Sequence, residues 1–112
     1  MKDLPEFRAH RREDVLNFVQ NVLTNDAQLK HHDVLELIEH KDGHYRVIFN
    51  PAYFILPEGQ TEPSKSQWAT LKKKFKRRDP NVFVFKEHGE TKTAGTRSYY
   101  LDFGFFAHPR RD

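Results

Sequence analysis

The apolar residues near the start of the chain recur with the period of an α-helix. Within RREDVLNFVQNVL they fall at i, i+3, i+4, i+7 and i+8, and they are Val15, Phe18, Val19, Val22 and Leu23. This spacing places them on one face of an amphipathic helix, which we predict over residues 11–24. The polar run Thr24-Asn25-Asp26 is predicted to end it.

A second pattern, typical of a β-hairpin, follows. Lys41-Asp42-Gly43 is a turn signal because Asp-Gly supplies the positive φ that a tight hairpin needs. After it, residues 45–49 alternate as in a strand. Before it, residues 34–39 fit either a strand or a helix face, and the adjacent turn favours the strand. Residues 52–56 are predicted to continue at a sheet edge or to form a short strand of their own, because Pro51 interrupts the ladder.

A second helix is predicted after the loop PEGQTEP. Ser64 and Gln67 have the spacing of a capping box, which opens the helix, and Asp79-Pro80-Asn81 closes it after about Arg78. Only a narrow apolar stripe runs along this helix, formed by Trp68, Leu71 and Phe75.

A second hairpin is predicted at the C-terminal end. Val82–Phe85 is read as an apolar strand covered on both faces. In the last strand, Tyr99, Leu101, Phe103 and Phe105 share one face, while Tyr100, Asp102 and Gly104 share the other. The polar stretch EHGETKTAGTRS between the two strands is predicted to be a long loop.

These elements predict an α+β fold in the order α-β-β-α-β-β, with two helices packed on one face of a mainly antiparallel sheet of four or more strands. The order also suggests one α-β-β unit used twice, although the two halves share little sequence. With 112 residues, we expect a single domain over 1–112, with frayed tails at 1–10 and 107–112.

The composition of the chain indicates the environment in which the protein is expected. No apolar run approaches the roughly 20 residues of a membrane span, so no membrane contact is predicted. The chain has no Cys, which excludes disulfides and thiolate chemistry. We expect a cytoplasmic protein.

Charge is distributed unevenly along the chain. Residues 1–63 hold 7 Lys and Arg against 11 Asp and Glu, whereas residues 64–112 hold 12 against 5. The positive charge concentrates in KKKFKRR, residues 72–78, and no acid lies between Glu62 and Asp79. A face that carries one sign of charge is unusual for a helix that needs only solubility.

An unmixed cationic face matches a polyanion, so the sequence favours a nucleic-acid-binding module. The candidate contact residues in the helix are Lys72, Lys73, Lys74, Lys76, Arg77 and Arg78. The polar stretch that follows adds Lys92 and Arg97. Tyr99 or Tyr100 would offer a stacking surface if exposed.

Two other interpretations remain open. An acidic protein surface would bind the same face, and self-association would use the apolar residues 51–56. Alternatively, the cations are only the solvated side of the helix.

No motif with a specific chemistry is present, so we expect neither an enzyme nor a cofactor. His40 and His44 flank the first turn and are predicted to face each other, with His88 joining them only if the hairpins lie side by side. The spacing of the seven His matches no known metal motif, and no metal site is predicted.

Overall fold

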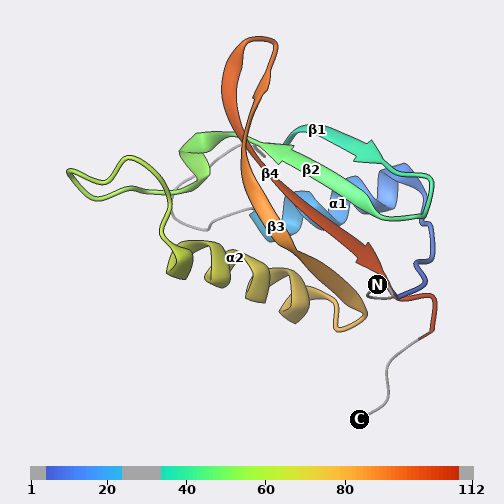
Figure 1. Ribbon diagram of the computed structural model, residues 1–112. Coiled ribbons are helices and arrows are strands. Elements are labelled where there is room, and N and C mark those ends of the chain that lie inside the picture. Colours follow the sequence, from blue (N-terminus) through green and yellow to red (C-terminus); the bar gives the residue numbers. More distant parts are fainter. Residues whose placement is uncertain (1–4, 24–33, 109–112) are drawn as a thin grey trace.

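The computed structural model of the protein describes residues 5–23 and 34–108 (Figure 1). Its helices and strands have the predicted order α-β-β-α-β-β, with one short 3-10 helix added. In chain order the elements are α1 (Arg12–Leu23), β1 (Val34–Glu39), β2 (Tyr45–Phe49), η1 (Pro51–Tyr53), α2 (Lys65–Arg78), β3 (Val82–Thr93) and β4 (Thr96–Phe105).

The four strands form one antiparallel sheet in the order β1-β2-β4-β3. The two hairpins join where β2 pairs with β4, so that Val47 lies opposite Leu101. β1 and β3 are therefore the edges of the sheet. The register of β3 shifts between Val84 and His88, and such a bulge bends an edge strand and interrupts its ladder.

Both helices pack on the same face of the sheet, as predicted. From α1, the Phe18 ring lies 6.0 Å from the ring of Phe103. From α2, the Phe75 ring lies 5.2 Å from the same Phe103 ring. Trp68 of α2 meets Tyr99 at 5.8 Å, and Tyr99 shares the face of Phe103 because the two are four residues apart in one strand. One apolar layer between helices and sheet thus forms the core.

The opposite face of the sheet is partly covered by the N-terminal segment. The backbone N–H of Arg8 donates to the carbonyl oxygen of Phe105 at 2.8 Å, and Phe7 forms a bridge with Phe106. Residues 5–8 therefore pair with the end of β4, although they belong to a predicted frayed tail. Residues 1–4 and 109–112 of the predicted tails lie outside the described residues.

Several local predictions are confirmed. The first helix covers Arg12–Leu23, and its predicted stop at residues 24–26 lies outside the described residues. Residues 34–39 form a strand, which settles the choice between strand and helix. α2 begins with the complete capping box of Ser64 and Gln67.

The prediction for residues 52–56 is wrong. Pro51–Tyr53 forms a 3-10 helix, and its cap is Asn50, whose side-chain oxygen accepts from the backbone N–H of Ala52 at 2.8 Å. Proline fits the first position of such a turn because it has no N–H to satisfy. The turn leads Tyr53 and Phe54 into the core.

The prediction of a long polar loop after Phe85 is also wrong. β3 continues to Thr93, β4 starts at Thr96, and the turn between them places Ala94 and Gly95 at positive φ. The far half of this hairpin extends beyond the rest of the sheet (Figure 1). At its other end, only Val82 of the segment 82–85 is fully buried, so that segment is not covered on both faces as predicted.

Candidate nucleic-acid interface

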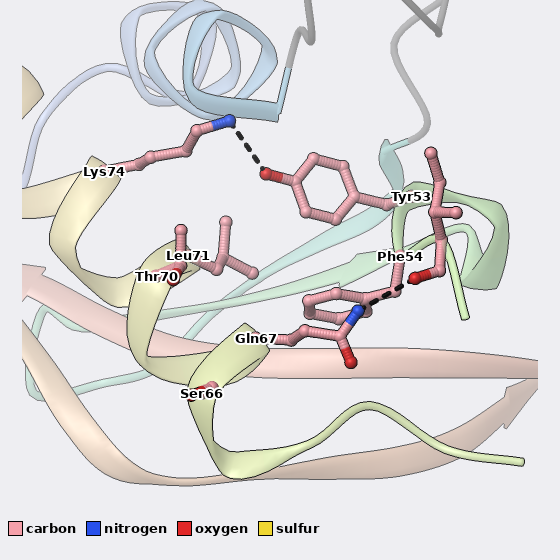
Figure 2. A pocket seen from close by; sticks show the side chains of 8 residues that line it. Tyr53, Phe54, Ser66, Gln67, Thr70, Leu71 and Lys74 are labelled. Carbon is pink, nitrogen blue, oxygen red and sulfur yellow. Dashed lines mark hydrogen bonds between the residues drawn. The ribbon is translucent and has the colours of Figure 1, made fainter. Parts of the chain in front are cut away.

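The start of α2 is fixed by a small network around Gln67. Its backbone N–H donates to the Ser64 hydroxyl at 3.1 Å, and its side-chain oxygen accepts from the backbone N–H of Ser64 at 2.9 Å. Its side-chain nitrogen donates to the carbonyl oxygen of Ile55 at 2.9 Å (Figure 2). The capping box satisfies orphan donors of the first turn, and the third bond ties the preceding loop to the helix.

The apolar stripe of α2 sets the direction in which its cations point. Trp68, Leu71 and Phe75 are exposed by 6%, 1% and 0%, so this stripe faces the core. The cations occupy the rest of the helical circumference. In the second half of the helix, four of these cations are exposed: Lys73, Lys76, Arg77 and Arg78. They form the basic face of α2, and three of them lie in the last turn, where the helix dipole favours positive charge.

Within the described residues, no carboxylate lies within 4.0 Å of a cation of α2. Elsewhere in the molecule the picture differs. Arg12 pairs with Glu39 at 3.4 Å, and Arg46 pairs with Asp102 at 2.7 Å. Among the described residues, the basic face of α2 therefore has no ion-pair partner, whereas Arg12 and Arg46 of other elements do.

Two of the predicted contact residues are held by the protein itself. The ammonium of Lys72 donates to the carbonyl oxygen of Lys86 in β3 at 2.7 Å. Burial, together with the neighbouring Lys76 charge, lowers the pKa of Lys72. The ammonium of Lys74 donates to the Tyr53 hydroxyl at 3.1 Å (Figure 2). These two are therefore less available than the four exposed cations.

The other two predicted residues lie apart from the basic face. Lys92 and Arg97 are paired neighbours in the projecting part of the β3–β4 hairpin. Arg97 also forms an ion pair with Glu90 at 3.1 Å and donates to the Tyr99 hydroxyl at 2.8 Å. The structure brings the helical cations together, and it places Lys92 and Arg97 on a separate element.

Neither tyrosine of the last strand is a free stacking surface. Tyr99 is 2% exposed in the core, and its burial raises the pKa of its hydroxyl against the opposing effect of Arg97. Tyr100 lies on the opposite face of the sheet, where the guanidinium of Arg46 sits 4.1 Å from the centre of its ring. The ring of Tyr99 is therefore buried and the ring of Tyr100 is already in contact with Arg46, so neither is open for base stacking.

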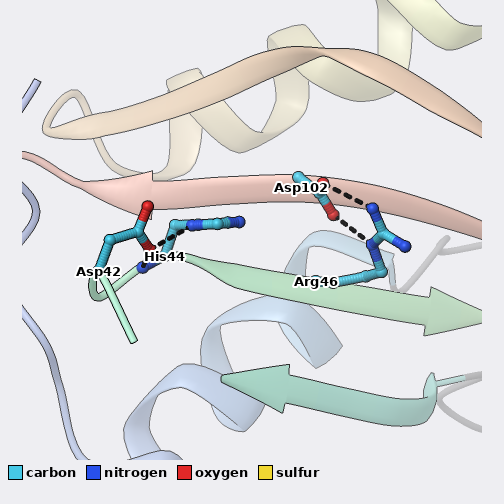
Figure 3. A network of polar contacts seen from close by, with 4 residues as sticks. All are labelled: Asp42, His44, Arg46 and Asp102. Carbon is cyan, nitrogen blue, oxygen red and sulfur yellow. Dashed lines mark hydrogen bonds and ion pairs between the residues drawn. The ribbon is translucent and has the colours of Figure 1, made fainter. Parts of the chain in front are cut away.

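The face of the sheet away from the helices carries a polar network. Arg46 holds Asp102 with two hydrogen bonds of 2.7 and 3.0 Å (Figure 3). The hydrogen bond to Asp102 raises the pKa of the Arg46 guanidinium. Partial burial opposes ionisation of Asp42, but hydrogen bonds from the backbone and ring of His44 outweigh it and lower the pKa of Asp42. Arg46 and Asp102 are partners across β2 and β4, and Asp42 and His44 belong to the β1–β2 turn, so both contacts are explained by the fold.

The histidines are arranged as predicted at the first turn only. The rings of His40 and His44 stack at 4.1 Å. His88 lies on the helical face of the sheet, stacked on Trp68 at 4.1 Å, and does not join them. Across residues 5–23 and 34–108, no three His, Asp or Glu side chains gather as a metal-binding group. His31 and His32 lie outside this part of the chain.

Sequence reasoning missed a cleft beside the basic face. It has a volume of about 350 Å³ and lies between α2 and the segment 53–55 (Figure 2). Its apolar side includes Ile55, which is 57% exposed, and its helical side consists of Ser66, Thr70 and Lys74. The i, i+4, i+8 spacing of these three polar residues was the available signal, since it aligns them in one row.

Comparison with known proteins finds no matching family, no matching curated protein and no matching solved structure. Among the described residues, no helix has the length and apolar character needed to cross a membrane. The geometry of the site itself therefore carries the functional argument.

Proposed function

We propose that this protein is a non-enzymatic module that binds nucleic acid through the basic face of α2. The observation that carries the proposal is the set of four exposed cations with no carboxylate of the described residues in ion-pair distance. Lys and Arg in such a setting neutralise phosphates and release the counterions that surround a nucleic acid. Lys73 and Arg77, one turn apart, lie nearly opposite the buried stripe and would contribute most.

The surroundings of the basic face support nucleic acid over an acidic protein. Protein interfaces are anchored by large apolar or aromatic side chains near their centre. Among the described residues, the exposed large hydrophobic side chains are Leu35 on β1 and Ile55 at the cleft beside α2, so the basic face itself carries none. Next to the cations, the outward side of the helix carries only Ser66, Ala69 and Thr70. Such a surface is better suited to contacts with a charged phosphate backbone than to contacts with the apolar anchor residues of a protein partner.

The test is a binding titration of the purified protein with labelled single-stranded and double-stranded DNA and RNA at about 50 and 200 mM salt. We expect affinity to fall steeply between the two salts, with a log–log slope of about −0.7 per phosphate contact on single strands and −0.9 on duplexes. With three or four contacts, the loss is about 20- to 150-fold.

Two results would count against the proposal. Absence of binding at about 50 mM salt would leave an acidic protein as the partner of the same face, and a basic-face variant would then be compared in capture of acidic proteins. Binding that is insensitive to salt would show that phosphate contacts do not drive the interaction. Self-association would appear separately, as a rise in molar mass with protein concentration.

A further inference from the structure

The cleft between α2 and the segment 53–55 shares the helix that carries the basic face. Ser66, Thr70 and Lys74 form the row of α2 that borders the cleft. Lys73 and Arg77, one turn apart, lie next to this row when the helix is viewed along its axis. A strand whose phosphates contact Lys73 and Arg77 therefore has the cleft directly beside it.

The lining of the cleft suits a flat, partly polar ring. Ile55 supplies the exposed apolar surface, whereas Phe54 and Leu71 line the cleft but are 8% and 1% exposed. The hydroxyls of Ser66 and Thr70 supply donors and acceptors along one side. Sites that bind small rings combine a mostly apolar lining with a few placed polar groups, and the volume of about 350 Å³ falls at the lower end of their range.

The charge at the cleft points to an anionic ligand. Lys74 lies at its border, where its ammonium is 3.1 Å from the Tyr53 hydroxyl and 5.6 Å from the centre of the Tyr53 ring. Of the residues that the structure describes, none with a carboxylate side chain lines the cleft. An open cleft with both apolar and polar lining, a cation at its border and a basic face beside it is complementary to a nucleobase and its own phosphate.

We propose that the cleft receives an unpaired base, so that the protein selects single-stranded nucleic acid. The inference rests on the proposed function and narrows its ligand. In a duplex the bases are stacked and paired, and none enters a side cleft without being flipped out of the helix. In a single strand the bases are free to turn toward the protein while the phosphates stay on the basic face.

The experiment compares three ligands of equal phosphate count at about 50 and 200 mM salt. They are a single-stranded oligodeoxynucleotide of about 12 nucleotides, the same backbone made of abasic tetrahydrofuran units, and a duplex of matched charge. We expect the natural single strand to bind about 5- to 150-fold more tightly than the abasic strand, which is the range for stacking of one base.

A pair of variants assigns the effect to the cleft. Ile55→Asp places a carboxylate on the exposed apolar side of the cleft, and Leu35→Asp makes the same change at the other exposed apolar side chain, on β1. Ile55→Asp is expected to reduce binding of the natural single strand to the abasic level. Because the new carboxylate also repels phosphates, the quantity compared is the ratio of natural to abasic affinity, which Leu35→Asp should leave unchanged.

Each alternative outcome is decisive. Equal, salt-dependent binding of natural and abasic strands would overturn the cleft proposal and leave the basic face standing. A preference for the natural strand that Ile55→Asp leaves intact would place base recognition elsewhere and overturn the cleft assignment. If no ligand binds at about 50 mM salt, both proposals fall.

Discussion

The ammonium of Lys72 is bonded to the carbonyl oxygen of Lys86, 14 positions later in the chain, at 2.7 Å. This bond joins α2 to the irregular part of β3, where the register shift leaves backbone groups without their usual cross-strand partners. Lys72 is therefore tied to the sheet, whereas its neighbour Lys73 is exposed. Adjacent lysines of one helix thus have different surroundings.

This difference predicts opposite effects of two matched substitutions. Lys72→Met keeps the apolar stem but loses the hydrogen bond, so we expect the free energy of unfolding to fall by about 1 kcal/mol with little change in nucleic-acid affinity. Lys73→Met should leave stability within about 0.5 kcal/mol and reduce the salt slope by about 0.7 to 0.9. Urea denaturation and salt titrations measure the two. Equal loss of affinity in both variants would contradict the division of roles.

The pair Arg46–Asp102 predicts a further stability effect. Asp102 has a side chain exposed by only 7%, and Arg46 provides its two hydrogen bonds. Arg46→Met leaves a buried carboxylate unpaired, and we expect a loss of about 1–3 kcal/mol in the free energy of unfolding. Arg8→Met, at an exposed position, is the control and should cost less than about 0.5 kcal/mol. Equal effects of the two changes on denaturation midpoints would show that the pair is not stabilising.

Gly104 predicts how tightly the N-terminal segment packs on the sheet. A Cβ at this position would lie 2.5 Å from the ring of Phe7, so Gly104→Ala must displace that ring. We expect a loss of about 1–3 kcal/mol from overpacking. In a Phe7→Ala background the same substitution should cost much less, because the two residues are coupled. Additive losses in the double variant would show that Phe7 does not occupy the space above Gly104 in solution.

His88 predicts a pH dependence of stability. Burial and the nearby Lys72 charge lower its pKa below 6.5, and the backbone of Lys86 offsets this only in part. The unfolded chain therefore binds the proton more readily, so stability rises with pH through this range and falls as pH drops below about 6.5. His88→Phe keeps a ring against Trp68 and should flatten the fall between about pH 7 and 5 in thermal denaturation. An unchanged profile would exclude His88 as its source.

The elements that the sequence predicts correctly are those whose apolar pattern points to one face. Trp68, Leu71 and Phe75 determine the orientation of α2, and the alternation from Tyr99 to Phe105 determines that of β4. Both patterns reflect burial against the same core, so local periodicity and tertiary structure agree.

The hairpin end beyond Phe85 could not be predicted from apolar periodicity, because few of its side chains are buried. Residues 90–97 pair with each other, mostly exposed, outside the covered part of the sheet. Its strand character comes from backbone pairing and from Thr91, Thr93 and Thr96, whose β-branched side chains favour extended structure. Because the segment is mostly polar, its composition is typical of a loop and not of a strand.

The candidate site was predicted only in part for a related reason. Charge along the sequence identifies the basic run of α2 but not the partners that Lys72 and Lys74 find in space. The cleft depends on η1, a turn set by Asn50 and Pro51 that brings residues 53–55 beside the helix. Such contacts between distant segments follow from the packed structure and not from local patterns.

The measurement that tests the basic face most directly is the salt-dependent affinity of a double charge reversal. Lys73→Glu with Arg77→Glu is compared with Arg8→Glu with Lys41→Glu, a control pair of exposed cations with the same change in net charge. We expect the helix pair to lose at least about tenfold in affinity at about 50 mM salt and about 1.5 to 2 units of salt slope. The control pair should retain most of both. Equal losses in the two variants, with both folded by circular dichroism, would contradict the assignment of binding to α2.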